Sequence, residues 1–135
     1  MKKNNLIFVY GSLRAASSHP MSTYFRRNSE FISKAYILGT LYDLGEYPGV
    51  VVRPDSLSRV YGELYRIKEK YYEEVIERLD YYEGYDPDIP DQSEFIRTTV
   101  HVFTDQGVCE SQVYLYTFDN IQNEIESGDY FDRDK

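Results

Sequence analysis

The sequence has few of the residues on which disulfide, metal and nucleophilic chemistry depend. Its 135 residues include one cysteine and two histidines. An intramolecular disulfide, a thiolate metal cluster and a histidine-based zinc site therefore all lack the ligands they need. We expect no metal site. Tryptophan is absent, but fifteen tyrosines and seven phenylalanines give the aromatic content of a chain that folds rather than one that stays disordered.

Positive charge and long apolar runs are also scarce. The formal net charge is −8 and no run of lysines or arginines occurs, so nucleic acid and anionic membranes would on average be repelled. The apolar run Leu6–Tyr10 is too short for a signal peptide or a membrane span. We therefore expect one domain over residues 1–135, located in the cytoplasm, with no nucleic-acid or membrane partner.

The opening stretch of the chain combines a buried strand with a tight turn. Leu6–Tyr10 is continuously apolar or aromatic and predicts a strand buried on both faces. Gly11 follows it and permits backbone angles that a residue with a Cβ would resist. Beyond it, Ser12 and Leu13 offer successive backbone N–H groups that could hold an anion or an oxyanion. An ordinary exit from strand to loop is the alternative.

The remaining elements alternate between helix and strand signals. Apolar spacing predicts helices over Met21–Asn28 and Glu69–Tyr82, the second ended by Gly84. Alternation and turn residues predict strands and a hairpin. The first of these strands covers Ala35–Leu44, with a bend at Gly39, and a turn at Gly45–Gly49 leads to a second strand at Val50–Val52. A third strand covers Val60–Ile67, where Gly62 would allow another backbone to approach closely. The hairpin is formed by Phe95–Phe103 and Val108–Phe118. A helical turn is expected over Ile121–Glu126, and Asp86–Asp91 is expected to be a loop that forms a lid or rim.

One carboxylate falls where the second helix should be apolar. The stripe formed by Tyr72, Ile76 and Leu79 reaches Glu83 one turn later, among several tyrosines. A carboxylate there would lose part of its hydration, which raises its pKa toward neutrality and suits it to acid–base catalysis. The alternative is a solvated helix end at which Glu83 swings outward. Asp80 is a possible second acid, although a bond to a loop or backbone group is the simpler role.

Three further side chains capable of chemistry have simpler interpretations. His19 falls in a polar loop and is best interpreted as solvent-exposed. His101 and Cys109 fall within the predicted hairpin strands, so a nucleophile–base pair formed by them would be an accident of position.

Ordered short motifs along the chain resemble the γ-glutamylcyclotransferase-like family, in particular its γ-glutamylamine cyclotransferase branch and small bacterial relatives. The motifs run from residue 6 to about residue 130: Val9-Tyr10-Gly11-Ser12-Leu13-Arg14, Gly39–Gly45 with Tyr47-Pro48-Gly49, Val60–Tyr65, Leu79-Asp80-Tyr81-Tyr82-Glu83-Gly84-Tyr85, Arg97–Val100 and Ser127-Gly128-Asp129-Tyr130. The resemblance implies an α+β fold, a mixed β-barrel with a few flanking helices, and no cofactor. It also implies that Glu83 is the catalytic residue and that backbone groups of Tyr10, Gly11, Ser12 and Leu13 bind the substrate, with Arg14 supporting the loop.

The implied reaction needs nothing that the sequence lacks. The α-amino nitrogen of a γ-glutamyl amine or γ-glutamyl amino acid attacks its own γ-carbonyl, forming 5-oxoproline and releasing an amine. A raised pKa would let Glu83 accept the proton of the attacking nitrogen and return it to the departing one. Two alternatives stay open: a non-catalytic binding domain with the same pocket, and a hydrolase that uses Asp80 and Glu83 as a carboxylate pair.

Overall fold

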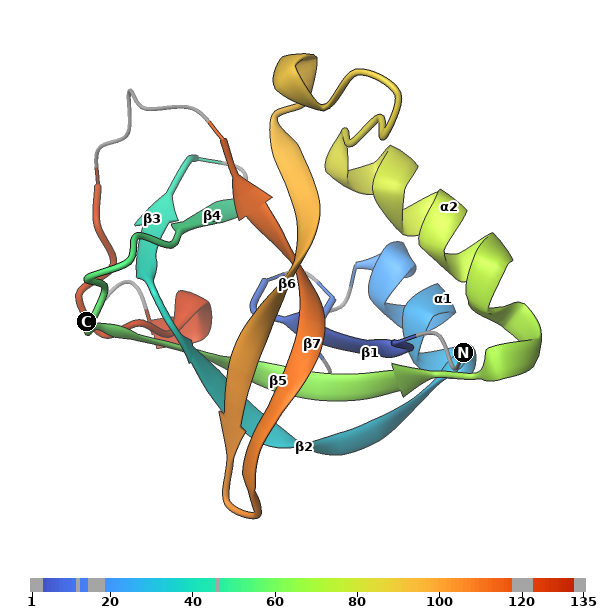
Figure 1. Cartoon of the computed structure of the whole chain (residues 1–135), viewed down its shortest axis with the longest axis horizontal. Helices are drawn as coiled ribbons and strands as arrows, with labels where there is room; N and C mark the ends of the chain where they lie inside the picture. The colour runs from blue at the N-terminus through green and yellow to red at the C-terminus, as the bar shows by residue number, and fades with distance from the viewer. Residues whose placement is uncertain (1–3, 12, 15–18, 46, 118–122, 133–135) are drawn as a thin grey trace.

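Five strands close into a mixed barrel in the computed structural model, which describes residues 4–11, 13–14, 19–45, 47–117 and 123–132 (Figure 1). Around the barrel they follow the order β1 (Leu6–Val9), β5 (Arg59–Ile67), β2 (Ser29–Leu38), β6 (Phe95–Thr104) and β7 (Gly107–Tyr116). All neighbours are antiparallel except β1 and β7, whose parallel pairing closes the barrel. The predicted α+β barrel and the predicted hairpin of β6 and β7 are both confirmed.

The first strand is buried on both faces, as its continuous apolar run predicts. Phe8 belongs to a core that includes Leu64 and Val113, whereas Ile7 and Val9 belong to a second core that includes the apolar side of the long helix. Gly62 makes the approach of β5 to β1 possible, because a Cβ there would collide with the carbonyl oxygen of Val9. The first strand therefore joins the two cores, and its end lies close to both.

The described residues form two α-helices outside the barrel, α1 (Pro20–Arg27) and α2 (Tyr72–Glu83), the latter preceded by the 3-10 turn η1 (Glu69–Tyr71). Figure 1 shows α2 running along one side of the barrel, with its C-terminal end near the start of β6. Gly84 ends α2 in the left-handed conformation, with φ of 71°, so the predicted stop is confirmed. Short 3-10 turns also occur at η2 (Pro90–Gln92) and η3 (Tyr130–Asp132). Within the described residues, no helix has the length and apolar character to cross a membrane.

The strands β3 (Thr40–Asp43) and β4 (Pro48–Val51) form a separate two-stranded sheet. In this region the structure differs from three sequence predictions. The strand expected over Ala35–Leu44 begins earlier, at Ser29, and is divided at Gly39 into β2 and β3. Pro48 and Gly49 belong to β4 rather than to the turn. Where a helical turn was expected, Glu124 instead forms an antiparallel bridge with Tyr42; residues 121 and 122 of that segment lie outside the described part.

Candidate active site

The end of α2 carries Glu83 toward the end of the first strand. Val75, Ile76 and Leu79 are buried against the barrel, and the helix keeps its geometry through Glu83 before Gly84 ends it. Because the helix has not unwound at Glu83, this residue continues the core-facing stripe. The tertiary packing of the helix therefore fixes the direction in which the carboxylate points.

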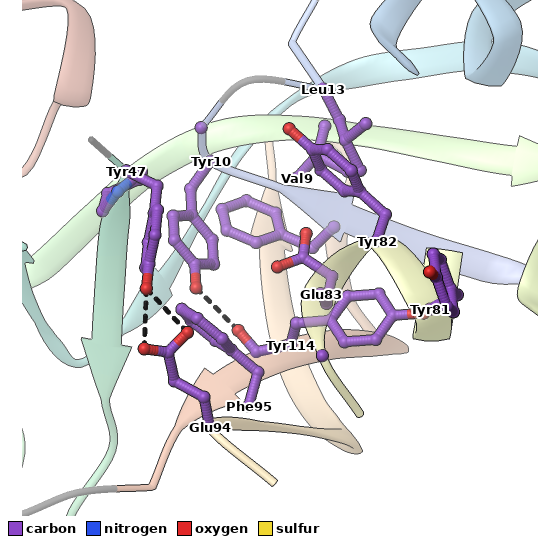
Figure 2. A pocket seen from close by; sticks show the side chains of 14 residues that line it. Val9, Tyr10, Leu13, Tyr47, Tyr81, Tyr82, Glu83, Glu94, Phe95 and Tyr114 are labelled. Carbon is purple, nitrogen blue, oxygen red and sulfur yellow. Dashed lines mark hydrogen bonds between the residues drawn. The ribbon is translucent and has the colours of Figure 1, made fainter. Parts of the chain in front are cut away.

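A cavity of about 250 Å³ lies between the end of α2, the turn after β1 and the start of β6. This volume is near the lower end of the range found for small-molecule sites. Its wall is largely aromatic and draws on segments far apart in the sequence, with rings from Phe8, Tyr10, Tyr47, Tyr81, Tyr82, Phe95 and Tyr114. Figure 2 shows the carboxylate of Glu83 within this cavity, facing Tyr10 and Val9.

The surroundings of Glu83 favour its protonated form. Burial, and to a smaller extent the negative charge of Glu94, raise the pKa of Glu83 to about 8. Within the described part of the chain neither a cation nor a hydrogen-bond donor offsets this rise. The side chain is nevertheless partly accessible from the cavity, so a bound molecule can reach it. This carboxyl group can exchange a proton near neutral pH.

The turn after β1 lines the opposite wall with Tyr10, Gly11 and Leu13. Ser12, the fourth residue expected there, lies outside the described residues. The hydroxyl of Tyr10 donates to the carbonyl oxygen of Tyr114 at 2.7 Å, which ties the turn to β7. Burial first, and the charge of Glu83 second, raise the pKa of Tyr10 well above its ordinary value. Tyr10 is therefore a neutral structural donor with its hydroxyl already engaged.

Glycine is required at position 11 for a reason that the sequence does not reveal. Its φ is outside the left-handed region, so the expectation of unusual backbone angles is wrong. A Cβ at this position would instead lie 2.8 Å from Cγ of Pro48, closer than real Cβ atoms approach. Gly11 thus lets the turn pack against the start of β4 beside the cavity.

Arg14 anchors the same turn to the C-terminal segment. Its guanidinium donates to Asp129 at 2.7 Å and lies over the ring of Phe131 at 4.5 Å. Gly128, just before Asp129, has φ of 72° and packs against the backbone of Arg59. The Ser-Gly-Asp-Tyr motif therefore holds the turn from outside, in agreement with a supporting role for Arg14.

Asp80 occupies a different environment from Glu83. Its carboxylate accepts hydrogen bonds from Arg97 Nε at 2.9 Å and Nη2 at 3.2 Å, and from the Tyr114 hydroxyl at 2.6 Å. It is not among the residues that line the cavity. The two carboxylates do not share one cleft, and the structure therefore gives no support to the carboxylate-pair hydrolase.

The other candidate residues do not line the cavity. His19 caps α1, where its Nδ1 accepts from the backbone N–H of Met21. His101 is exposed and Cys109 is partly buried on neighbouring strands, where they pair with Glu110 and Val102. Among the residues that the structure describes, no group of three or more His, Cys, Asp or Glu side chains is arranged to hold a metal ion. The loop expected to be a lid, residues 86–91, contributes nothing to the described cavity wall.

Sequence reasoning missed two polar residues of the cavity wall, Tyr47 and Glu94. The oxygen of the Tyr47 hydroxyl lies 2.7 and 2.6 Å from the two carboxylate oxygens of Glu94 and donates to that group (Figure 2). Neither residue lies on a periodic stripe, so no local pattern marks them. The Tyr-Pro-Gly motif contained Tyr47 but gave no indication of its partner.

Comparison with known proteins identifies the family and the fold. The model of the family described as γ-glutamyl cyclotransferase, AIG2-like, matches residues 7–132. The γ-glutamylcyclotransferase family protein YtfP of Escherichia coli K12 is 35% identical over 136 residues, covering 96% of this chain and 98% of its own. The crystal structure of YkqA from Bacillus subtilis superposes with a TM-score of 0.70 at 29% identity, covering 95% of this chain but only 40% of YkqA.

A mouse AIG2-like protein has the same fold, with a TM-score of 0.65 at 22% identity over 86% of this chain and 80% of its own. The mixed barrel with its flanking helices is thus an AIG2-like fold. The chain belongs to the γ-glutamyl cyclotransferase, AIG2-like, family.

Proposed function

We propose that the protein is a cofactor-independent cyclotransferase that converts a γ-glutamyl amine or γ-glutamyl amino acid into 5-oxoproline and a free amine, and that it acts in the cytoplasm. The α-amino nitrogen of the substrate attacks the γ-carbonyl carbon, a C–N bond forms and closes a five-membered ring, and the original amide C–N bond breaks. No water or second substrate is consumed. The enzyme has only to fold the substrate into the reactive conformation and move one proton.

Glu83 is the group proposed to move that proton. A free α-amino group has a pKa of about 8 and an ordinary glutamate one of 4.5, a mismatch that makes an ordinary glutamate a poor base. With its pKa raised to about 8, Glu83 accepts a proton from the attacking nitrogen at little free-energy cost. The resulting acid then donates that proton to the departing nitrogen, which leaves as the free amine.

The turn over residues 10–13 is proposed to hold the glutamyl part of the substrate. Tyr10, Gly11 and Leu13 line the cavity wall that faces Glu83, and the hydroxyl of Tyr10 is already occupied. Backbone N–H groups of this turn are therefore proposed to bind the α-carboxylate or the oxyanion that develops during attack; the N–H of Ser12, expected among them, lies outside the described residues.

A single observation carries the proposal: the carboxylate of Glu83 lies in an aromatic cavity, opposite a backbone turn, with a pKa of about 8. The test is release of 5-oxoproline from γ-glutamylbutylamine by the purified protein. We expect Glu83→Gln to lower the rate constant by about 10²–10⁴-fold while still binding 5-oxoproline. Glu77→Gln, on the exposed side of the same helix, is the matched control and should keep its activity.

Two results would contradict the proposal. Turnover by Glu83→Gln at the wild-type rate would remove Glu83 from the mechanism. Binding of 5-oxoproline with no turnover of any γ-glutamyl amine or amino acid would instead identify a binding domain that keeps the same cavity.

A further inference from the structure

The cavity wall contains a second carboxylate that the proposed reaction does not use. Glu94 comes just before β6 and is partly buried. The hydroxyl of Tyr47 holds its carboxylate, with the hydroxyl oxygen 2.7 and 2.6 Å from the two carboxylate oxygens. Tyr47 in turn packs edge-on against Phe95, with ring centroids 5.9 Å apart. Glu94 is therefore a negative charge held in a defined position at the cavity rather than a free surface side chain.

Among the described residues of the cavity wall, no positive charge balances Glu94. Of the described residues that line the cavity, Glu83 and Glu94 carry carboxyl groups, and lysine, arginine and histidine do not occur among them. A bound molecule that carries a carboxylate beside Glu94 would be repelled and would find no cation in the described wall. One that carries an ammonium group there would be attracted, because opposite charges at this depth interact more strongly than in bulk water.

The positions of the walls indicate which part of a substrate meets Glu94. In Figure 2, Leu13 and Tyr82 are at one edge of the cavity, Tyr47 and Glu94 are at another, and the carboxylate of Glu83 lies between them. If the glutamyl group binds at the turn after β1, as proposed above, its γ-carbonyl would lie near Glu83. The released amine would then extend toward Tyr47 and Glu94.

We propose that Glu94 determines specificity, selecting substrates whose released amine carries a second positive charge, such as the γ-glutamyl derivative of a short diamine. This inference rests on the proposed function and names its substrate class. The cavity volume of about 250 Å³ restricts the amine to a short chain. The rings of Tyr47 and Phe95 provide an apolar surface for its methylene groups, and Glu94 pairs with its terminal ammonium.

The test compares three γ-glutamyl substrates of similar chain length whose released amines end in different groups. These are the derivatives of 1,4-diaminobutane, of butylamine and of 4-aminobutyrate, which end in an ammonium, a methyl and a carboxylate group. Wild-type kcat/KM should be highest for the diamine derivative and lowest for the carboxylate. The ratio of diamine to butylamine derivative should be about tenfold and should fall as salt is added.

Two matched variants distinguish the effect of a negative charge at the cavity from that of a negative charge elsewhere on the surface. Glu94→Gln should bring the ratio of diamine to butylamine derivative to about one. Glu110→Gln, which makes the same chemical change at an exposed position on β7, should leave the ratio at its wild-type value. Both substrates are measured with the same enzyme at the same pH. An effect of Glu94 on the protonation of Glu83 therefore changes both kcat/KM values equally and cancels from their ratio.

The failures are distinguishable. Release of 5-oxoproline from all three substrates at similar rates, or an unchanged ratio in Glu94→Gln, would overturn the role of Glu94 while leaving the cyclotransferase in place. Absence of 5-oxoproline from all three and from γ-glutamyl amino acids would overturn the proposed function and this inference with it.

Discussion

Asp80 and Glu83 are acidic residues three positions apart on the last turn of α2, and they lie in opposite environments. Asp80 receives three hydrogen bonds, two from Arg97 and one from Tyr114. Glu83 receives none from the described residues, and burial together with the charge of Glu94 opposes its ionisation. The same helix thus carries one fully partnered carboxylate and one that has lost hydration without gaining a partner.

This difference separates a structural acid from a functional one. Arg97 and Tyr114 belong to β6 and β7, so the bonds of Asp80 fasten the helix to the barrel. A helix fastened in this way holds Glu83 at a fixed place in the cavity while leaving its proton free to exchange. Partially buried acids without partners reduce stability, and proteins keep them where function requires them.

The largest effect on stability should follow from removing the carboxylate of Asp80, the structural acid. Asp80→Ala leaves the partly buried guanidinium of Arg97 and the hydroxyl of Tyr114 without their acceptor. We expect the free energy of unfolding to fall by about 3 kcal/mol, measured by urea denaturation. Glu77→Ala on the exposed side of the same helix is the control and should change it by about 0.5 kcal/mol or less. Equal, small losses for both would mean that Asp80 does not fasten the helix.

Replacing Glu83, the functional acid, should raise the free energy of unfolding, whereas replacing Asp80 lowers it. The pKa of Glu83 is raised by folding from an ordinary value of 4.5 to about 8, so its folded form loses stability as the pH rises between these values. Glu83→Gln removes this loss. The free energy of unfolding of this variant should exceed that of wild type by about 2 kcal/mol at pH 8.5 and match it near pH 4.5. The difference is smaller than the full pKa shift would give, because solvent in the cavity screens the charge of Glu83.

Urea denaturation at several pH values from 4.5 to 8.5 measures this difference. A stability difference that grows with pH would show that Glu83 is buried, because a solvated helix-terminal glutamate would give the same difference at every pH. Asp80→Asn is the comparison: it removes an acceptor oxygen that Arg97 and Tyr114 use, so it should destabilise the protein.

The sequence was sufficient to predict those parts of the site that depend on local periodicity. The spacing of Tyr72, Ile76 and Leu79 assigned an inward direction to Glu83, and the helix indeed continues to that residue before Gly84 ends it. The apolar run at β1 likewise predicted burial on both faces. Both signals arise from regular backbone geometry, which sequence spacing reports directly.

Features that depend on contacts between distant segments could not be predicted. Tyr47 and Glu94 are 47 residues apart and meet only because β4 and the start of β6 adjoin the same cavity. Gly11 is needed because Pro48 packs against it, a contact that a search for turn residues does not detect. The bridge from Glu124 to Tyr42 similarly replaces a locally plausible helical turn by a tertiary pairing.

The smallest effect tests whether Glu94 contributes to the contrast between the two acids. Its negative charge is the second cause of the raised pKa of Glu83, after burial. Glu94→Gln should therefore lower the pKa of Glu83 by about half a pH unit, measured by ¹³C NMR titration of the carboxyl carbon and assigned with Glu83→Gln. Glu110→Gln should leave the titration unchanged. If Glu94→Gln also leaves it unchanged, burial alone would account for the protonation of Glu83, and the two acids would differ only in their partners.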